Sequence, residues 1–258
     1  MRRKLVVGNW KLNGSLSENK ILIASLLKNL KTIQTTDFAI CFPYTYLFQA
    51  QALLTGTNIF WGAQNVSQFR SGAHTSSISA DMIADFDCSF AIIGHSERRA
   101  ISNESNQKAA KRFARSVSAG ITPIYCVGET AEERAEGLAE NVVKNQILAI
   151  TYGLDESIFE SAKQVNMVIA YEPVWAIGSG RTASPQQAQE MHAFIRDLIA
   201  NIDAEFSERV RIIYGGSVTP DNALALLSMP DIDGGLIGRC SLIAEEFSQI
   251  CRLASLHS

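Results

Sequence analysis

The stretch NMVIAYEPVWAIGSGRTASP, residues 166–185, contains one complete unit of the fold that we predict. It begins with an apolar run without alternating polar positions, which is typical of a strand buried on both faces in a parallel sheet. The run ends on the carboxylate of Glu172 and continues into a glycine-bearing loop. Ser184 followed by Pro185 then marks the start of a helix. The unit is therefore a buried strand, a loop and a helix.

Similar apolar runs recur along the whole chain. Each has four to eight residues and is followed by helical or turn-rich sequence. They are LVVG (5–8), FAICF (38–42), IFWGA (59–63), FAIIG (90–94), ITPIYCVG (121–128), NMVIAYE (166–172), VRIIYGG (210–216) and GGLIG (234–238).

Helical patterns fill the intervals between the runs. Ser17 and Glu18 predict the start of one helix, and Thr130 with Glu133 forms a capping-box pattern that predicts the start of a second, long helix. A third helix follows Ser184. The expected apolar positions are Ile21, Leu22, Leu26, Leu27 and Leu30 in the first helix, Val142, Val143 and Ile147 in the second, and Met191, Phe194, Ile195 and Leu198 in the third.

Eight such units in 258 residues predict an α/β fold, a single-domain eight-stranded parallel (β/α)8 barrel. No linker or low-complexity tract divides the chain, so we expect residues 1–258 to form one catalytic domain. The alternative is a doubly wound open sheet. That fold usually carries a G-x-G-x-x-G turn after its first strand, whereas here GNWK (8–11) follows.

The composition narrows the class of protein. The chain is 47% hydrophobic and 19% charged with a formal net charge of −3, which gives no electrostatic reason to expect nucleic acid or an anionic membrane as a partner. No stretch of about 20 apolar residues predicts a membrane span, and the first ten residues lack the apolar region of a signal peptide. We therefore expect a cytoplasmic enzyme. The cysteines are too scattered for a disulfide framework or a zinc site: Cys41, Cys88, Cys126, Cys240 and Cys251.

In a parallel barrel the functional site lies at the carboxyl ends of the strands. Each residue found there has an ordinary explanation alone, such as a surface lysine or a loop histidine, but those explanations do not predict convergence on one face. The loops after strands seven and eight are also where barrels often hold phosphate. The residues gathered are Asn9, Lys11, His95, Glu97, Glu172, Gly215, Gly216, Ser217, Gly238 and Arg239.

The chain resembles the triosephosphate isomerase family over essentially its whole length. The segments that carry the resemblance appear in order, and those around His95 and Glu172 are very specific. They are GNWK (8–11), AQNV (63–66), IIGHSERR (92–99), CVGE (126–129), AYEPVWAIGSG (170–180), YGGSV (214–218) and GLIG (235–238).

The resemblance implies interconversion of dihydroxyacetone phosphate and D-glyceraldehyde 3-phosphate, in glycolysis and gluconeogenesis, without metal or cofactor. It makes Glu172 the base, His95 the group that polarises the carbonyl, and Lys11 the balancing charge. Such enzymes are themselves the reference case for a carboxylate base, a neutral histidine and a water-excluding loop. Asn9 lies beside these residues, Ser96 and Glu97 support them, and the substrate-binding positions are Asn9, Lys11, Gly178, Ser217, Gly238 and Arg239.

The resemblance also implies a lid and a homodimer. Residues 173–175 and 181–183 would be the hinges of the lid and residues 176–180 its tip, while residues 64–79 would reach into a neighbouring subunit.

The enzyme alternative is another barrel isomerase or aldolase acting on a phosphorylated sugar. An aldolase of the Schiff-base type would need a lysine buried at a strand end in the middle of the barrel, whereas Lys11 follows the first strand. The non-enzyme alternative is a barrel that binds a phosphate ligand without turnover, which the presence of Glu172 and His95 does not favour.

The chain departs from the family pattern at a few positions. Arg239 replaces a common glycine, His74 replaces a usual aromatic residue, and Ser179 and Arg181 replace threonine and lysine in the lid. At 239, either the guanidinium or only the backbone N–H contacts phosphate. We favour the backbone, because any residue except proline supplies that donor.

Overall fold

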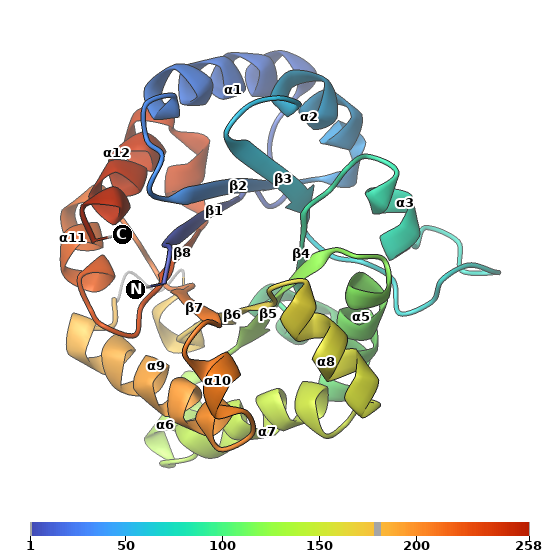
Figure 1. The fold of residues 1–258 in the computed structure, drawn as a ribbon, viewed down its shortest axis with the longest axis vertical. Coiled ribbons are helices and arrows are strands. Elements are labelled where there is room, and N and C mark those ends of the chain that lie inside the picture. The colour runs from blue at the N-terminus through green and yellow to red at the C-terminus, as the bar shows by residue number, and fades with distance from the viewer. Residues whose placement is uncertain (1, 178–181, 258) are drawn as a thin grey trace.

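The computed structural model describes residues 2–177 and 182–257. In this part of the chain eight parallel strands close into a barrel in sequence order, with β8 paired to β1. Helices surround the strands in Figure 1. The strands are β1 (Leu5–Asn9), β2 (Asp37–Phe42), β3 (Ile59–Ala63), β4 (Phe90–Ile93), β5 (Thr122–Val127), β6 (Val168–Tyr171), β7 (Arg211–Tyr214) and β8 (Gly234–Ile237). The predicted barrel is confirmed, and the open sheet is excluded.

The strands are apolar on both faces because each face has its own core. On β1, Leu5 and Val7 belong to the cluster that fills the barrel, while Val6 belongs to the larger cluster between strands and helices. Successive strand residues point to opposite faces, so both sets must be apolar. This packing explains why the strand runs of the sequence do not alternate.

The helices follow the strands around the outside. They are α1 (Leu16–Leu30), α2 (Leu47–Leu54), α3 (Ala80–Ala84), α4 (Ser96–Ser102), α5 (Asn106–Ser118), α6 (Ala131–Ala135), α7 (Ala139–Thr151), α8 (Glu156–Gln164), α9 (Pro185–Ala200), α10 (Ala204–Ser207), α11 (Pro220–Leu227) and α12 (Ala244–Ala254). Short 3-10 helices are η1 (Tyr44–Tyr46), η2 (Val174–Ala176), η3 (Arg239–Leu242) and η4 (Ser255–His257).

Two predicted helix starts are confirmed. The side chain of Ser184 accepts the N–H of Gln187 at 3.1 Å at the start of α9. Thr130 and Glu133 form the predicted capping box of α6. The single long helix after Thr130 was wrong, because α6 ends before Gly137, which takes a left-handed φ of 73°, and α7 begins afterwards.

The predicted start of α1 was also wrong. Ser15, not Ser17, caps this helix through the N–H of Glu18. Of the predicted apolar face, Leu26 and Leu30 are buried, but Ile21 is 70% exposed and Ile23 is buried in its place. Several apolar residues in a row allowed more than one helical face, and packing against the core selects among them.

Residues 64–79, between β3 and α3, project away from the barrel in Figure 1. The base of this segment is fixed, since the N–H of Ser67 donates to the Ile78 carbonyl at 2.7 Å. At its exposed end, the rings of Phe69 and His74 stack with centroids 3.7 Å apart. The segment is thus a structured projection, with a hydrogen bond at its base and stacked rings near its tip.

The scattered cysteines behave as predicted. All five are free and buried. Among the described helices, none has the length and apolar character that crossing a membrane requires.

Candidate active site

A cavity of about 540 Å³ opens at the carboxyl ends of the strands. Every predicted site residue within the described part of the chain lines it: Asn9, Lys11, His95, Glu97, Glu172, Ser217, Gly238 and Arg239. Gly178 and the remainder of the predicted lid tip, with Arg181, fall outside the described residues. The structure therefore brings together groups supplied by β1, β4, β6, β7 and β8.

Glu172 follows β6 and is only 2% exposed. Its Oε2 atom accepts the backbone N–H of Ser96 at 2.8 Å, and its Oε1 atom lies 2.9 Å from Nε2 of His95. Burial opposes ionisation, but His95 and the Ser96 N–H hold the pKa of Glu172 below its usual value. The buried Oε1 atom has no well-aligned hydrogen bond among the described residues. The carboxylate is thus held by the Ser96 N–H on one oxygen and faces Nε2 of His95 with the other.

His95 sits at the N-cap position of α4. Its Nδ1 atom accepts the N–H of Glu97 at 3.2 Å, so the ring proton is assigned to Nε2, which faces Glu172. Burial lowers the pKa of His95, but the Glu172 carboxylate more than offsets this and raises it. The histidine therefore presents an N–H donor to the cavity.

Lys11 follows β1 in a left-handed conformation with φ 52°, which is uncommon for a residue with a side chain. Its N–H donates to Oδ1 of Asn9 at 3.1 Å, and its carbonyl accepts from Gln64 at 3.0 Å. These bonds hold the strained backbone. The Nζ atom pairs with Oε1 of Glu97 at 2.5 Å, so the predicted support residue contacts the predicted balancing charge.

Glycines shape the far side of the cavity. A Cβ atom on Gly215 would lie 2.8 Å from Cγ of Glu172, and one on Gly216 would lie 2.2 Å from the Tyr214 hydroxyl. The loop after β7 can therefore approach Glu172 only with glycine at 215, while Tyr214 fills the space that a side chain at 216 would need. The next N–H, that of Ser217, has no acceptor among the described residues, so it is available to an anion.

Arg239 begins η3 directly after β8. Its φ is not left-handed, so the backbone accommodates arginine there without strain. Within the described residues, its guanidinium makes no ion pair and its recorded contact is the Sγ atom of Cys240 at 4.0 Å. At this position either the guanidinium or the backbone N–H of Arg239 can reach a bound phosphate.

Sequence reasoning missed the role of Glu129. This carboxylate is fully buried after β5, where Oε1 accepts from Trp175 Nε1 at 2.8 Å, from the Tyr171 hydroxyl at 3.1 Å and from Arg134 at 2.9 Å. It ties the first predicted hinge to the barrel. The signal was present, since CVGE, like VIAYE, ends a buried apolar run on an acid.

Comparison with known proteins agrees with this geometry. The family model for triosephosphate isomerase matches residues 4–254. A triosephosphate isomerase from Thiobacillus denitrificans is 49% identical over 255 residues, which cover 99% of this chain and 100% of the relative. One from Nitrosomonas europaea is 47% identical, covering 98% of each chain, and one from Nitrosococcus oceani is 48% identical, covering 98% of this chain and 100% of the relative. The chain therefore belongs to the triosephosphate isomerase family.

Proposed function

We propose that this enzyme interconverts dihydroxyacetone phosphate and D-glyceraldehyde 3-phosphate through an enediolate, as a step of glycolysis and gluconeogenesis. Family membership supports the reaction. The observation that carries the mechanism is the buried, ionised Glu172, whose Oε1 atom lies beside the N–H of His95 in a cavity that also holds Lys11. Abstraction of a proton next to a carbonyl needs such a base, together with donors for the developing oxyanion.

Substrate phosphate would be held by the loops after β7 and β8. The free N–H of Ser217 and the turn at Gly238 and Arg239 support this placement, because both segments line the same wall of the cavity. With the phosphate there, the carbonyl end of a three-carbon substrate would extend toward Lys11 and His95. Gly178 remains a proposed contact from the lid.

The proton transfer would proceed in two stages. Glu172 takes a proton from the carbon beside the carbonyl, and the electrons of that C–H bond form the enediolate while His95 donates from Nε2 to the carbonyl oxygen. Glu172 then delivers the proton to the former carbonyl carbon. At the same time the hydroxyl on the carbon that lost its hydrogen gives its proton back to Nε2 of His95 and becomes the new carbonyl. For its own transfers, the carboxylate of Glu172 must exchange its bond with the Ser96 N–H for contact with substrate.

Movement of Glu172 would also set the charge of His95. Burial, the largest influence, lowers the pKa of His95, as does Lys11, whereas Glu172 and, to a smaller extent, Glu97 raise it. Once the Glu172 carboxylate turns to the substrate, its larger raising influence is lost while burial remains, and the N–H of Glu97 still occupies Nδ1. A neutral imidazole is therefore the form that would polarise the carbonyl.

The assay that tests the function supplies D-glyceraldehyde 3-phosphate and follows dihydroxyacetone phosphate through a coupled NADH-dependent reductase. We expect turnover that persists with a metal chelator present, because none of the proposed steps uses a metal. Absence of turnover in folded protein would remove the proposal. Turnover that the chelator abolishes would remove its cofactor-free part.

We further propose that the enzyme is a cytoplasmic homodimer assembled through residues 64–79. The projecting, exposed end of this segment supports assembly, and the bond from Gln64 to the Lys11 carbonyl links its base to the site. Five buried free thiols suit a reduced compartment. Deleting residues 68–74 should yield a monomer with sharply reduced kcat. A deletion variant that remains dimeric in sedimentation, or a fully active monomer, would contradict the assembly.

A further inference from the structure

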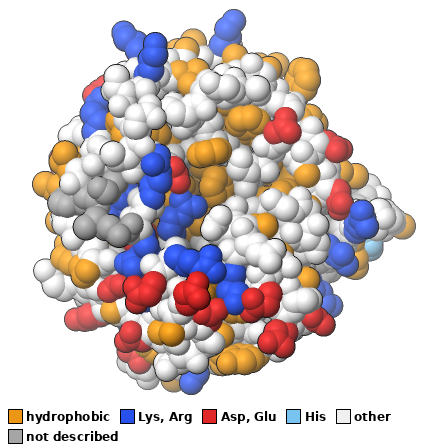
Figure 2. All heavy atoms as spheres, in the orientation of Figure 1, with side chains coloured by type: hydrophobic (Ala, Val, Ile, Leu, Met, Phe, Trp, Pro, Cys, Tyr) orange, Lys and Arg blue, Asp and Glu red, His pale blue; other side chains and the backbone are white. Residues whose placement is uncertain are grey.

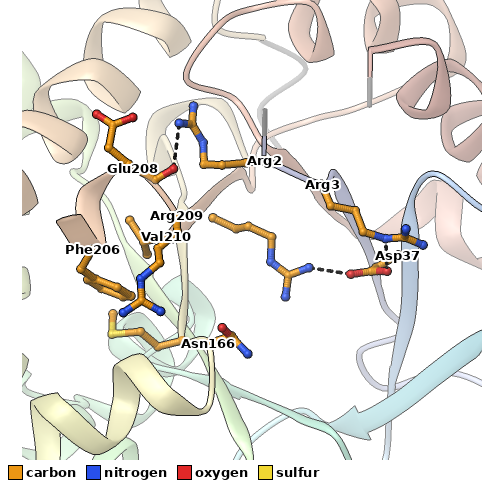
Figure 3. Close-up of a pocket in the computed structure, with 10 residues that line it drawn as sticks. Arg2, Arg3, Asp37, Asn166, Phe206, Glu208, Arg209 and Val210 are labelled. Atoms are coloured by element: carbon orange, nitrogen blue, oxygen red, sulfur yellow. Dashed lines mark hydrogen bonds and ion pairs between the residues drawn. The ribbon is translucent and has the colours of Figure 1, made fainter.

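A second cavity, of about 560 Å³, lies at the opposite, amino end of the barrel (Figure 3). Arg2 and Arg3 precede β1, Asp37 begins β2, and Arg209 and Arg211 flank the start of β7. Figure 3 shows Arg3 with Asp37 on one side of this cavity and Arg209 on the other. No step of the proposed reaction uses these residues.

One carboxylate serves two of the arginines. Arg3 Nε lies 2.5 Å from Oδ1 of Asp37, and Arg211 Nη1 lies 2.9 Å from Oδ2. The other nitrogens of these two guanidinium groups have no acceptor among the residues that the structure describes. Each guanidinium therefore keeps unused N–H donors beside the cavity.

The two other arginines of the cavity, Arg209 and Arg2, differ in whether they already have a partner. Arg209 lies over the ring of Phe206 at 5.4 Å and, within the described residues, makes no ion pair. Arg2 is already occupied, since it donates to Asp233 at 2.8 Å and to the Pro230 carbonyl at 2.9 Å. Arg2 thus forms a fixed wall, while Arg209 is an available cation.

The charges of this cavity do not balance. Arg2 is paired with Asp231 and Asp233. The three remaining arginines, Arg3, Arg209 and Arg211, therefore stand against Asp37 and Glu208 and leave a formal excess of one positive charge on a chain whose net charge is −3. Figure 2 shows Lys and Arg side chains gathered over this region, around β1 and β7, with acidic side chains bordering them below. Burial lowers the pKa of Arg211 even though Asp37 opposes the shift. The cation is therefore only partly compensated.

We propose that this cavity binds a small polyanion carrying phosphate or carboxylate groups, held between the Arg3–Arg211 pair and Arg209. Planar guanidinium groups bind phosphate and carboxylate well, because each guanidinium presents parallel N–H donors to two oxygens of the anion. The volume exceeds that of one phosphate, and cations lie on both sides, so an anion with two charged groups fits better than one with a single group.

Inorganic pyrophosphate is a suitable probe, with binding measured by titration calorimetry and, separately, by competitive inhibition of turnover. Competitive inhibition measures binding to the catalytic cavity alone. Any pyrophosphate that calorimetry detects beyond that binding is assigned to the second site. The test variant is Arg3→Gln/Arg209→Gln. Both side chains are largely exposed, so their loss leaves the fold intact. Arg211 is kept, because its removal would leave Asp37 without a buried partner.

We expect the test variant to bind pyrophosphate at the second site at least about 10-fold more weakly, since it loses charge-assisted hydrogen bonds. Its KM, kcat and inhibition constant should match the wild type. The control Lys20→Gln/Arg252→Gln removes the same charge from exposed positions elsewhere and should bind like the wild type. A single class of site equal to the inhibition constant, or equal weakening in test and control variants, would overturn the proposal.

Discussion

The two ends of the barrel carry cavities of similar size, about 540 Å³ and 560 Å³, but they use charge differently. At the carboxyl end, Glu172 is buried with one oxygen that lacks an aligned donor. Beneath the amino end, the buried Asp233 accepts from Arg2, from Arg196 and from the Ile212 N–H. A buried carboxylate that faces the cavity with one oxygen lacking an aligned donor suits the proposed proton transfer, whereas the bonds of Asp233 hold its charge within the fold.

The chain connections explain this difference. Loops that follow the strands carry glycines whose missing side chains make room, as Gly215 does for Glu172. Connections that enter the strands instead place arginines and aspartates at the strand starts, where Arg211 of β7 pairs with Asp37 of β2 and Arg196 of α9 pairs with Asp233 before β8. If this contrast is correct, substitutions at one end should alter rate and those at the other should alter stability.

The largest expected effect is on turnover at the carboxyl end. Glu172→Gln should lower kcat by at least about 10³-fold, about 4 kcal/mol, with a much smaller change in KM, because the base acts in the transition state. Steady-state kinetics on folded protein measure this. The free energy of unfolding should fall little by comparison. An unchanged kcat would show that Glu172 is not the base.

The opposite result is expected for Asp233→Asn. Because the substitution leaves Arg196 and Arg2 with a neutral partner in a buried network, we expect the free energy of unfolding to fall by about 3 kcal/mol. Values of kcat and KM should stay within about twofold. Denaturant unfolding and kinetics on the same preparation check both parts. A selective loss of activity at full stability would break the contrast between the two ends.

The sequence predicted the barrel because its signals are repetitive and local. Each strand run is apolar through several residues and is followed by helical or turn-rich sequence, so the order of units implies the topology. The site residues were predictable for the same reason: in a parallel barrel, position at a strand's carboxyl end already places Lys11, His95 and Glu172 on one face.

The features that the sequence did not predict depend on how side chains from different strand–helix units meet in three dimensions. Ser15 and Ser17 are equally good caps by type, and only packing decides that Ser15 begins α1. The role of Glu129 required knowing that Trp175 and Tyr171 would meet it. The arginines of the amino end come from segments far apart in sequence, and no short motif relates Arg3 to Arg211.

A smaller expected effect concerns the coupling of Glu172 to His95. In His95→Asn the carboxylate loses the partner that lowers its pKa while burial, which raises it, remains. The pKa of Glu172 should therefore rise. Carbon NMR of protein with labelled glutamate measures this pKa, and the signal missing from the Glu172→Gln variant identifies the Glu172 resonance. An unchanged pKa would show that the contact of 2.9 Å does not control the charge of the base.

The same coupling has a consequence for stability. A carboxylate with a lowered pKa in the folded state stabilises the fold above the unfolded value of about 4.3, and this contribution is lost as pH falls through the folded pKa. His95→Asn should remove that contribution, so the variant should lose less stability than the wild type on acidification. Urea unfolding at a series of pH values measures the difference.

The smallest expected effect is at Arg239, the one charged residue in the proposed phosphate-binding turn after β8. If only the backbone N–H at 239 contacts phosphate, Arg239→Gly should shift KM by less than about threefold and leave kcat nearly intact, because glycine supplies the same donor. The exposed guanidinium, which makes no ion pair within the described residues, is consistent with this outcome.

A larger effect at Arg239 would change the contrast between the two ends of the barrel. A charge-assisted hydrogen bond contributes about 1.5–3 kcal/mol, so a KM increase above about tenfold would mean that the guanidinium itself holds the phosphate. Arg239→Lys separates the possibilities, since it keeps the charge but loses the planar pair of donors. If lysine restores KM, charge alone is sufficient. If it does not, the carboxyl end, like the proposed site at the amino end, recognises its anion through guanidinium geometry.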